Sequence, residues 1–210
     1  MIQALAHKAY NKIKRCNFLT YEDIDKFMTS LVKNIEDSKC DFDLLVEIAS
    51  GGGYPSERLS EKFRVKPVSM DISHYWVAIN SKKIKVPGVL WLAKHLGYKP
   101  KARIERDVEE RDIIGKKILI VDEDSYSGET LKAALESINQ KKPVYAKTAV
   151  LYTHDKNKLV DFSGYNFKEK DLYELNLRAP WSISAKYHNY NHGKKLSIVV
   201  PNLELVVSQA

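Results

Sequence analysis

The chain has 210 residues, enough for one domain with its own hydrophobic core, and a net charge of +7 that is spread along the sequence. A spread excess of Lys and Arg favours phosphorylated small molecules over nucleic acid as partners, and no apolar run approaches the ~20 residues that span a bilayer. Cys16 and Cys40 form no metal spacing and the N-terminus lacks the apolar core of a secretory signal, so the sequence predicts a cytoplasmic protein with reduced thiols.

The first two predicted elements are helices. Residues 1–17 carry apolar residues at helical spacing on one face, so we expect this helix to pack on the domain or on a partner subunit, in a homodimer. Thr20 begins the second helix as its cap, with Asp23 three residues later, and the apolar pattern continues to Ile35.

A strand and a glycine-rich turn come next. The predicted strand Phe42–Ile48 is followed by three consecutive glycines, Gly51, Gly52 and Gly53. Because glycines in a row cost conformational entropy, we expect the backbone to require them, and Pro55 suits the first turn of the next helix. The backbone N–H groups of such a turn can bind a diphosphate, although a plain tight turn would show the same pattern.

Two further strands are predicted at Val65–Ile72 and Tyr75–Ile79, and the segment around and after them is rich in Lys and Arg. Long insertions in compact domains are often functional lids, and we expect residues 73–111 to form one. The alternative is a charged surface that is simply solvated.

The stretch Ile118–Leu131 carries the strongest signal in the chain. Its first residues, Ile118–Val121, form an apolar run typical of a central parallel strand, and a helical apolar pattern follows the loop. The loop has free N–H groups at a helix N-terminus, where Gly128 allows close approach of an anion such as a phosphate. Asp122 and Glu123 instead suit sugar hydroxyls, or positive charge that develops on a sugar ring. A phosphate site beside paired carboxylates predicts a sugar phosphate as the ligand.

This stretch resembles the 5-phosphoribosyl-1-diphosphate (PRPP) motif of the type I phosphoribosyltransferases. The four apolar residues, the two acids and Ser-Gly-Glu-Thr at 127–130 follow the family's pattern, and the alternative is a plain strand–helix turn with a capping serine. The resemblance implies an α/β fold with a central, mostly parallel sheet flanked by helices, a small hood lobe and a flexible lid. It assigns PRPP and its 5′-phosphate to Asp122, Glu123, Ser125, Tyr126, Ser127, Gly128, Glu129 and Thr130, and the diphosphate to Ser50, Gly51, Gly52 and Gly53, with Asp122 and Glu123 as the catalytic pair.

Two residues bear on which purine would bind. Lys147, in the predicted strand Val144–Tyr152, resembles a lysine that meets the purine 6-substituent in the hypoxanthine-guanine and xanthine enzymes, although it also suits a strand end. Tyr126 stands where those enzymes carry an Asp that handles the N7 proton, and a phenol is a poor base at neutral pH. Adenine enzymes carry no Asp there. Tyr126 therefore favours adenine, and it outweighs Lys147 because a lysine can swing aside.

The resemblance also divides the chain into regions. Residues 18–158 are predicted as the PRPP-binding core, which includes the lid, and residues 159–210 as the hood and a C-terminal segment. Within the hood, Leu172 and Tyr173 are assigned to the base together with Tyr126 and Lys147. Tyr173 would stack on the purine, or would simply pack in the lobe.

The function predicted by the resemblance is that of a purine phosphoribosyltransferase of purine salvage, which converts adenine and PRPP to AMP and diphosphate. Mg²⁺ would be carried mainly by PRPP, and no protein ligand is predicted for it. The alternatives are a hypoxanthine-guanine or xanthine enzyme, a PRPP-sensing regulator that binds nucleic acid, and a non-catalytic PRPP-binding protein. No helix-turn-helix or dense basic stripe supports the regulator. Ser50, which replaces an Arg or Lys of many members, and Tyr126 suggest the non-catalytic protein.

Overall fold

The computed structural model describes residues 17–49, 51–75, 78–79, 82–83, 101–169, 171 and 177–181. The chain divides into two compact units, residues 25–174 and residues 1–24 together with 175–210. The strand after residue 159 belongs to the sheet of the larger unit, and the division into a core of residues 18–158 and a hood from residue 159 stays a prediction. Several residues of the prediction lie outside the described ranges: Ser50, Leu172, Tyr173 and nearly all of the N-terminal helix.

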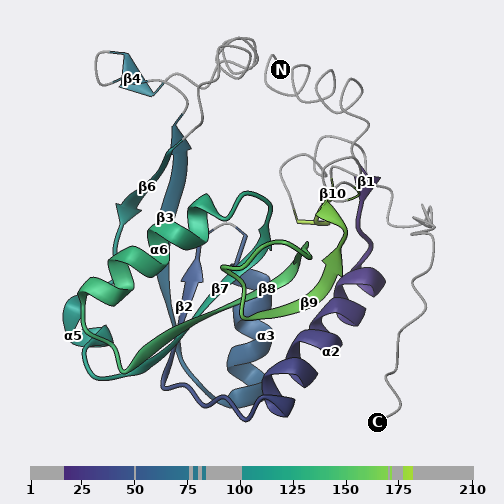
Figure 1. Ribbon diagram of the computed structural model, residues 1–210, viewed down its shortest axis with the longest axis horizontal. Coiled ribbons are helices and arrows are strands. Elements are labelled where there is room, and N and C mark those ends of the chain that lie inside the picture. The colour runs from purple at the N-terminus through teal and green to yellow at the C-terminus, as the bar shows by residue number, and fades with distance from the viewer. Residues whose placement is uncertain are drawn as a thin grey trace. The chain divides into compact units, whose positions relative to one another are not determined.

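A six-stranded sheet forms the centre of the unit 25–174 (Figure 1). The strand order is β6-β3-β2-β7-β8-β9, and neighbours are parallel except for β6, which pairs antiparallel with β3. The strands are β2 (Leu44–Ile48), β3 (Pro67–Tyr75), β6 (Lys101–Arg106), β7 (Lys117–Ser125), β8 (Tyr145–His154) and β9 (Phe162–Phe167). This mostly parallel sheet confirms the predicted α/β class.

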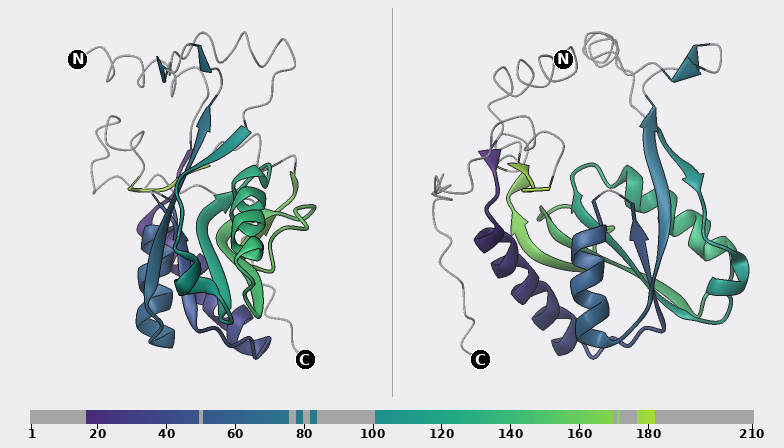
Figure 2. Two further views of the ribbon diagram at one scale, coloured as in Figure 1. Left: turned by 90° about the vertical axis from the view of Figure 1, so that its left-hand side faces the viewer. Right: turned by 180° about the vertical axis from the view of Figure 1, so that it is seen from behind.

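Helices lie on both faces of the sheet, with α3 (Gly53–Phe63) on one face and α6 (Glu129–Gln140) on the other (Figure 2). The helix α2 (Tyr21–Asp37) begins as predicted, since the N–H of Asp23 donates to Thr20 Oγ1 at 3.1 Å and the N–H of Thr20 donates to Asp23 Oδ2 at 2.8 Å. The helix α5 (Glu110–Ile113) is a single turn before β7. Of the helices in the described part of the chain, none is long and apolar enough to cross a membrane.

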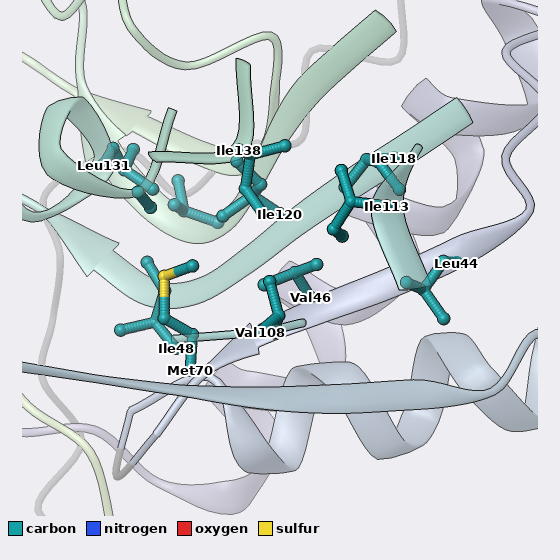
Figure 3. Packing of buried hydrophobic residues seen from close by; sticks show 12 residues of the cluster. Leu44, Val46, Ile48, Met70, Val108, Ile113, Ile118, Ile120, Leu131 and Ile138 are labelled. Carbon is teal, nitrogen blue, oxygen red and sulfur yellow. The ribbon is translucent and has the colours of Figure 1, made fainter. Parts of the chain in front are cut away.

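The core on the α6 side fixes that helix to the strands β2 and β7 (Figure 3). Val46 of β2 and Ile118 and Ile120 of β7 face Leu131 and Ile138 of α6, and none of the five is more than 1% exposed. Burying an aliphatic side chain of this size contributes about 1.5–3 kcal/mol. These contacts hold α6 against the sheet, so the N-terminus of α6 follows closely on the carboxyl end of β7.

The predicted lid, residues 73–111, has regular structure at both of its described ends. The strand β3 runs on to Tyr75 and pairs antiparallel with β6. A second antiparallel pair joins β4 (Ala78–Ile79) to β5 (Lys82–Lys83). The predicted strand Tyr75–Ile79 is therefore divided between the end of β3 and β4. A flexible lid stays a prediction for the residues between these pairs.

The unit formed by both ends of the chain is described in part. Its strands β1 (Asn17–Phe18) and β10 (Leu177–Arg178) pair in parallel, and the N–H of Leu19 donates to the carbonyl of Arg178 at 2.9 Å. The side chain of Leu177 is fully buried. Neighbouring strands from opposite ends of the chain therefore hold this unit together.

Candidate active site

A small pocket lies at the carboxyl end of β7, the edge at which parallel sheets bind their ligands. The strand continues past its predicted end and includes Asp122, Glu123 and Asp124, and a loop then leads to Glu129, where α6 begins. We call residues 125–130 the phosphate loop. The pocket has a volume of about 220 Å³ and is lined by Asp122, Asp124, Ser125, Tyr126, Ser127, Gly128 and Thr130. Most of the residues predicted to bind PRPP therefore meet in one place.

Gly128 shapes the phosphate loop. Its φ of 76° lies in the left-handed region, and a Cβ at this position would lie 2.8 Å from Leu159 Cδ1. The backbone angle therefore requires glycine, and a larger residue would also have to displace the end of the Leu159 side chain. As the residue before α6, Gly128 accepts a hydrogen bond from the N–H of Lys132 at 2.8 Å, while the N–H groups of the first turn have no acceptor within the helix. The loop thus has the geometry of an anion site.

The predicted diphosphate turn lies against the acids of β7. β2 and β7 are neighbours, so the turn that follows β2 reaches the same edge of the sheet. A Cβ on Gly51 would lie 2.7 Å from Asp122 Oδ1 and 3.2 Å from the Cβ of Glu123, and one on Gly52 would collide with the backbone of β7. The space around Gly53 is open. Packing against backbone therefore requires Gly52, a side chain at Gly51 would have to displace the carboxylate of Asp122, and the turn lies beside the acids.

Asp122 is a buried carboxylate among like charges. Its side chain is 9% exposed, and Oδ1 accepts a hydrogen bond from the N–H of Glu123 at 2.8 Å. Burial and then the negative charge of Asp124 raise the pKa of Asp122 well above its ordinary value, and the charge of Glu123 adds to the rise. Groups perturbed in this way gather at functional sites, where the arrangement serves chemistry at a cost in stability.

Tyr152 of β8 is a fully buried phenol beneath these acids. Its hydroxyl donates to Asp124 Oδ2 at 3.0 Å and lies 3.3 Å from Glu123 Oε1. Burial and the charges of Asp124 and Glu123 raise the pKa of Tyr152, so the phenol keeps its proton and remains a donor. Its ring packs against Phe27 and Phe167, and this packing fixes the hydroxyl beside the carboxylates.

A comparison with protein-family models matches residues 19–187 to the phosphoribosyl transferase domain. The match spans most of the chain and includes the acids, the phosphate loop and the glycine turn. The chain belongs to the phosphoribosyltransferase family. The predicted family is confirmed, and with it the class of enzyme, a PRPP-dependent pentosyltransferase. Among curated proteins, none matches the chain significantly.

Solved structures share the fold of this phosphoribosyltransferase. A hypothetical protein from Neisseria gonorrhoeae with bound ppGpp has a TM-score of 0.60 at 18% identity, over 81% of this chain and 92% of that one. A xanthine-guanine-hypoxanthine phosphoribosyltransferase from Helicobacter pylori has a TM-score of 0.58 at 19% identity, over 83% of this chain and 98% of that one. A purine phosphoribosyltransferase from Pyrococcus horikoshii has a TM-score of 0.56 at 22% identity, over 79% of this chain and 93% of that one. At such identities the likeness establishes the fold alone.

Sequence reasoning missed the residues of the phosphoribosyltransferase that support the phosphate loop from β8. Thr153 and His154 end that strand, and Asn157 follows it; all three bond to Ser125 or Tyr126. One signal was available, because polar residues directly after the apolar run of a parallel strand reach the ligand edge. The predicted strand ended at Tyr152 and left them out.

Lys147 lies far from the pocket, contrary to its predicted contact with the base. It is the third residue of β8 and pairs with Leu119, whereas Ser125 pairs with Thr153, six residues further along β8. Six residues of strand span roughly 20 Å. The Lys147 ammonium instead lies 5.3 Å from the ring centroid of Phe162, a cation–π contact at the amino end of the sheet. The sequence correctly placed Lys147 in a strand, but it did not show at which end of β8 the lysine lies.

Proposed function

We propose that the protein is a purine phosphoribosyltransferase, which transfers ribose 5-phosphate from PRPP to a ring nitrogen of a purine and releases diphosphate. The observation that carries this proposal is the position of Asp122 and Glu123 between two glycine turns, one after β2 and one before α6. Two anion-binding backbones on either side of paired acids match a sugar that carries a phosphate at one end and a diphosphate at the other. The phosphoribosyltransferase names of the Pyrococcus and Helicobacter proteins support a purine as the acceptor.

The roles of the residues follow from charge. The phosphate loop anchors the 5′-phosphate, and this remote binding energy lowers the barrier at the reacting carbon. As the bond to diphosphate loosens, positive charge develops on the ribose, beside Asp122 and Glu123. Burial and then the charges of Asp124 and Glu123 raise the pKa of Asp122, and a cation at this place offsets both effects, so the acids stabilise the transition state more than the ground state. In the turn after β2, the N–H of Gly52 donates to the carbonyl of Ile48 at 2.8 Å, so the N–H groups of Gly51 and Gly53 are the ones assigned to the departing diphosphate.

Mg²⁺ belongs to this proposal as a partner of PRPP. Carboxylate oxygens at the pocket suit a hard divalent cation, but within the described ranges no group of three or more His, Cys, Asp or Glu side chains could hold a metal ion. In this proposal the oxygens of PRPP bind the cation mainly, and no protein ligand is assigned to it. When bound, Mg²⁺ neutralises the charge of the leaving diphosphate.

We infer adenine as the preferred base, because Tyr126 supplies a phenol at the pocket where proton transfer from N7 of a 6-oxopurine would need a carboxylate. Lys147, the residue that favoured a 6-oxopurine, lies far from the pocket along β8 and therefore gives no support to that base. The alternative, a hypoxanthine-guanine or xanthine enzyme, is supported by the fold shared with the Helicobacter enzyme, and Asp124 is a carboxylate at the same pocket.

A single assay tests both choices. The protein is incubated with limiting PRPP, Mg²⁺ and equal adenine and hypoxanthine, and the nucleotides are separated; guanine and xanthine are tested in the same way. AMP as the main product supports adenine as the preferred base. IMP as the main product overturns the adenine preference but leaves the purine phosphoribosyltransferase function supported. No nucleotide from any base, with intact PRPP binding, would contradict catalysis and leave a PRPP-binding protein.

The assembly and location remain proposals. We propose a cytoplasmic homodimer whose ligands are PRPP, a purine base, a nucleoside monophosphate and diphosphate, with neither nucleic acid nor membrane as a partner. Light scattering at micromolar concentration is expected to give about twice the chain mass of 24.1 kDa, and a value at the single-chain mass would refute the dimer. Binding to nucleic acid that weakens steeply with salt would revive the regulator.

A further inference from the structure

The phosphate loop is held from behind by side chains at the carboxyl end of β8. The carbonyl of Ser125 accepts hydrogen bonds from Thr153 Oγ1 at 2.8 Å and from Asn157 Nδ2 at 3.2 Å. The carbonyl of Tyr126, the next residue, lies 2.8 Å from His154 Nε2. Two consecutive carbonyls of the loop are therefore both turned toward β8.

The protonation of His154 follows from its second contact. The N–H of Lys156 donates to His154 Nδ1 at 3.3 Å, so Nδ1 carries the lone pair. Nε2 then carries the hydrogen and donates it to the carbonyl of Tyr126. The ring is 7% exposed, and both of its nitrogens bond to the backbone. His154 therefore connects the turn after β8 to the phosphate loop.

The bond to Tyr126 also sets the direction of an N–H group. The carbonyl oxygen of Tyr126 and the N–H of Ser127 belong to one planar trans peptide, in which the two groups point in opposite directions. With the oxygen held toward His154, the N–H of Ser127 points away from β8. Tyr126 and Ser127 line the pocket and His154 does not, so His154 lies behind the loop. An anion needs N–H groups turned toward it and carbonyls turned away.

Asn157 supports the same arrangement at the neighbouring residues. Its Nδ2 also donates to Ser125 Oγ at 2.8 Å, and its Oδ1 accepts from the N–H of Leu159 at 3.2 Å. Leu159 is the residue whose side chain occupies the space beside Gly128. Asn157 thus links the first residue of the phosphate loop to the side chain that encloses its glycine.

We propose that His154, with Asn157, is a positioning residue that holds the phosphate loop so that the N–H of Ser127 faces a bound phosphoryl group. The inference rests on the proposed function, because it assumes that the pocket binds the 5′-phosphate of a ribose. It extends that function by assigning the orientation of the anion site to side chains outside the pocket, on the neighbouring strand.

The test compares two substitutions of one residue. In His154→Gln the side-chain amide can still donate to the carbonyl of Tyr126, whereas His154→Leu fills the space without a donor. We expect affinity for ribose 5-phosphate, measured by calorimetry, to fall about tenfold in His154→Leu and to stay within about threefold of wild type in His154→Gln. The KM for PRPP should rise in His154→Leu while the KM for the base is unchanged.

One further readout and one further variant separate positioning from a general loss of structure. The backbone amide signal of Ser127 in NMR spectra should shift on addition of ribose 5-phosphate in wild type and His154→Gln, and should respond less in His154→Leu. If His154→Leu does not fold, Asn157→Ala at a less buried site is expected to weaken binding in the same way. A severalfold loss there supports the inference.

The outcomes distinguish the two proposals. Wild-type affinity and a wild-type Ser127 response in His154→Leu, or in Asn157→Ala as its substitute, would overturn the inference and leave the proposed function intact. A wild-type protein that binds neither PRPP nor ribose 5-phosphate would overturn the proposed function, and the inference with it.

Discussion

The two ends of β7 and β8 arrange charge in opposite ways. At the amino end, Lys117 Nζ lies 2.5 Å from Asp41 Oδ2, and the Tyr145 hydroxyl donates to the carbonyl of Asp41. The bond from Lys117 and then that from Tyr145 hold the pKa of Asp41 below its ordinary value. At the carboxyl end, burial and a neighbouring carboxylate raise the pKa of Asp122. Opposite charges are paired at one end, and like charges are gathered at the other.

This difference indicates which end of the sheet binds a ligand. Paired exposed charges at the amino end contribute little to stability and make no demand on a partner. Gathered carboxylates at the carboxyl end oppose folding, because each charge raises the cost of the next. Such carboxylates beside two glycine turns are suited to stabilise a ligand that carries positive charge. The predictions below test the contrast, in order of decreasing effect.

The largest effect is expected from removing the charges of the acids. In the double variant Asp122→Asn with Glu123→Gln, kcat should fall by ~10²–10³-fold while PRPP affinity changes little, because the acids act on charge that develops in the transition state. Turnover is measured with saturating PRPP and base. The matched control is Asp41→Asn at the amino end, which should keep normal turnover. A double variant with unchanged kcat would contradict the assigned roles.

The next effect concerns the two glycines with positive φ on either side of β7. Gly128 has a φ of 76° at the pocket, and Gly115 has a φ of 67° before the amino end of the strand, with open space around it. Ligand at about 100 times its Kd stabilises a protein by ~2.7 kcal/mol, a melting shift of about 5–10 °C at this chain length. We expect Gly128→Val to lose the shift that PRPP produces and Gly115→Val to retain it.

The control built into that pair is the backbone cost. Both substitutions place a branched side chain at a left-handed φ, so both should lower the melting temperature without ligand, and Gly128→Val should lower it further because its side chain also meets Leu159. Scanning fluorimetry measures both quantities. If PRPP shifts both variants equally, the phosphate loop is not the anion site.

A smaller effect is expected from pH. The carboxyl of Asp122 should titrate above 3.8 and that of Asp41 below it, as followed by carbon-13 NMR. Because the folded pKa of Asp122 is raised, wild type loses stability as pH rises from about 4 through that pKa, and Asp122→Asn avoids the loss. At neutral pH this variant should therefore melt above wild type. Below about pH 4 the gain should vanish.

The effect of Asp41 on the pH dependence of stability has the opposite sign to that of Asp122. Its folded pKa is lowered, so its contribution is present above about pH 4 and is lost as pH falls through the folded pKa. Asp41→Asn should therefore melt slightly below wild type at neutral pH, and the two should converge in acid. The same direction of change for both variants at neutral pH would remove the contrast between the two ends.

The smallest effect is expected at Lys147. Because this side chain lies over Phe162 at the amino end, Lys147→Met should leave kcat and the ratio of AMP to IMP within about twofold of wild type. The competition assay with adenine and hypoxanthine measures this ratio. A changed base preference would show that the amino end influences the pocket after all.

The elements around the site could be predicted from local sequence. The apolar run Ile118–Val121, the acids after it and the helical pattern from Leu131 fixed β7, the phosphate loop and α6, because each signal is short-range and all agree. The two glycines Gly51 and Gly52 were also recognised. Their contact with Asp122 was not predicted, since it depends on β2 and β7 being neighbours in the sheet.

Features that depend on long-range pairing could not be predicted. β6 contains the alternation of a strand, but only its antiparallel pairing with β3 places it in the sheet. Lys147 was assigned to the base by its spacing in the chain, which does not show that it begins β8 rather than ends it. The polar residues that follow the apolar run of β8 indicate the ligand edge, but the sequence does not show that His154 and Asn157 bond to a loop about thirty residues earlier.

The strand β6 also decides how the sheet ends. Among the strands that the structure describes, it is the outermost on its side, and its exposed residues Arg103 and Glu105 alternate with the half-buried Ala102 and Ile104. An outer strand with apolar side chains and open backbone groups is a template on which strands of other molecules can assemble. Charged side chains at such an edge make that assembly unfavourable. Because the insertion before β7 returns the chain alongside β3 as a charged strand, we expect it to oppose edge-to-edge assembly of the sheet.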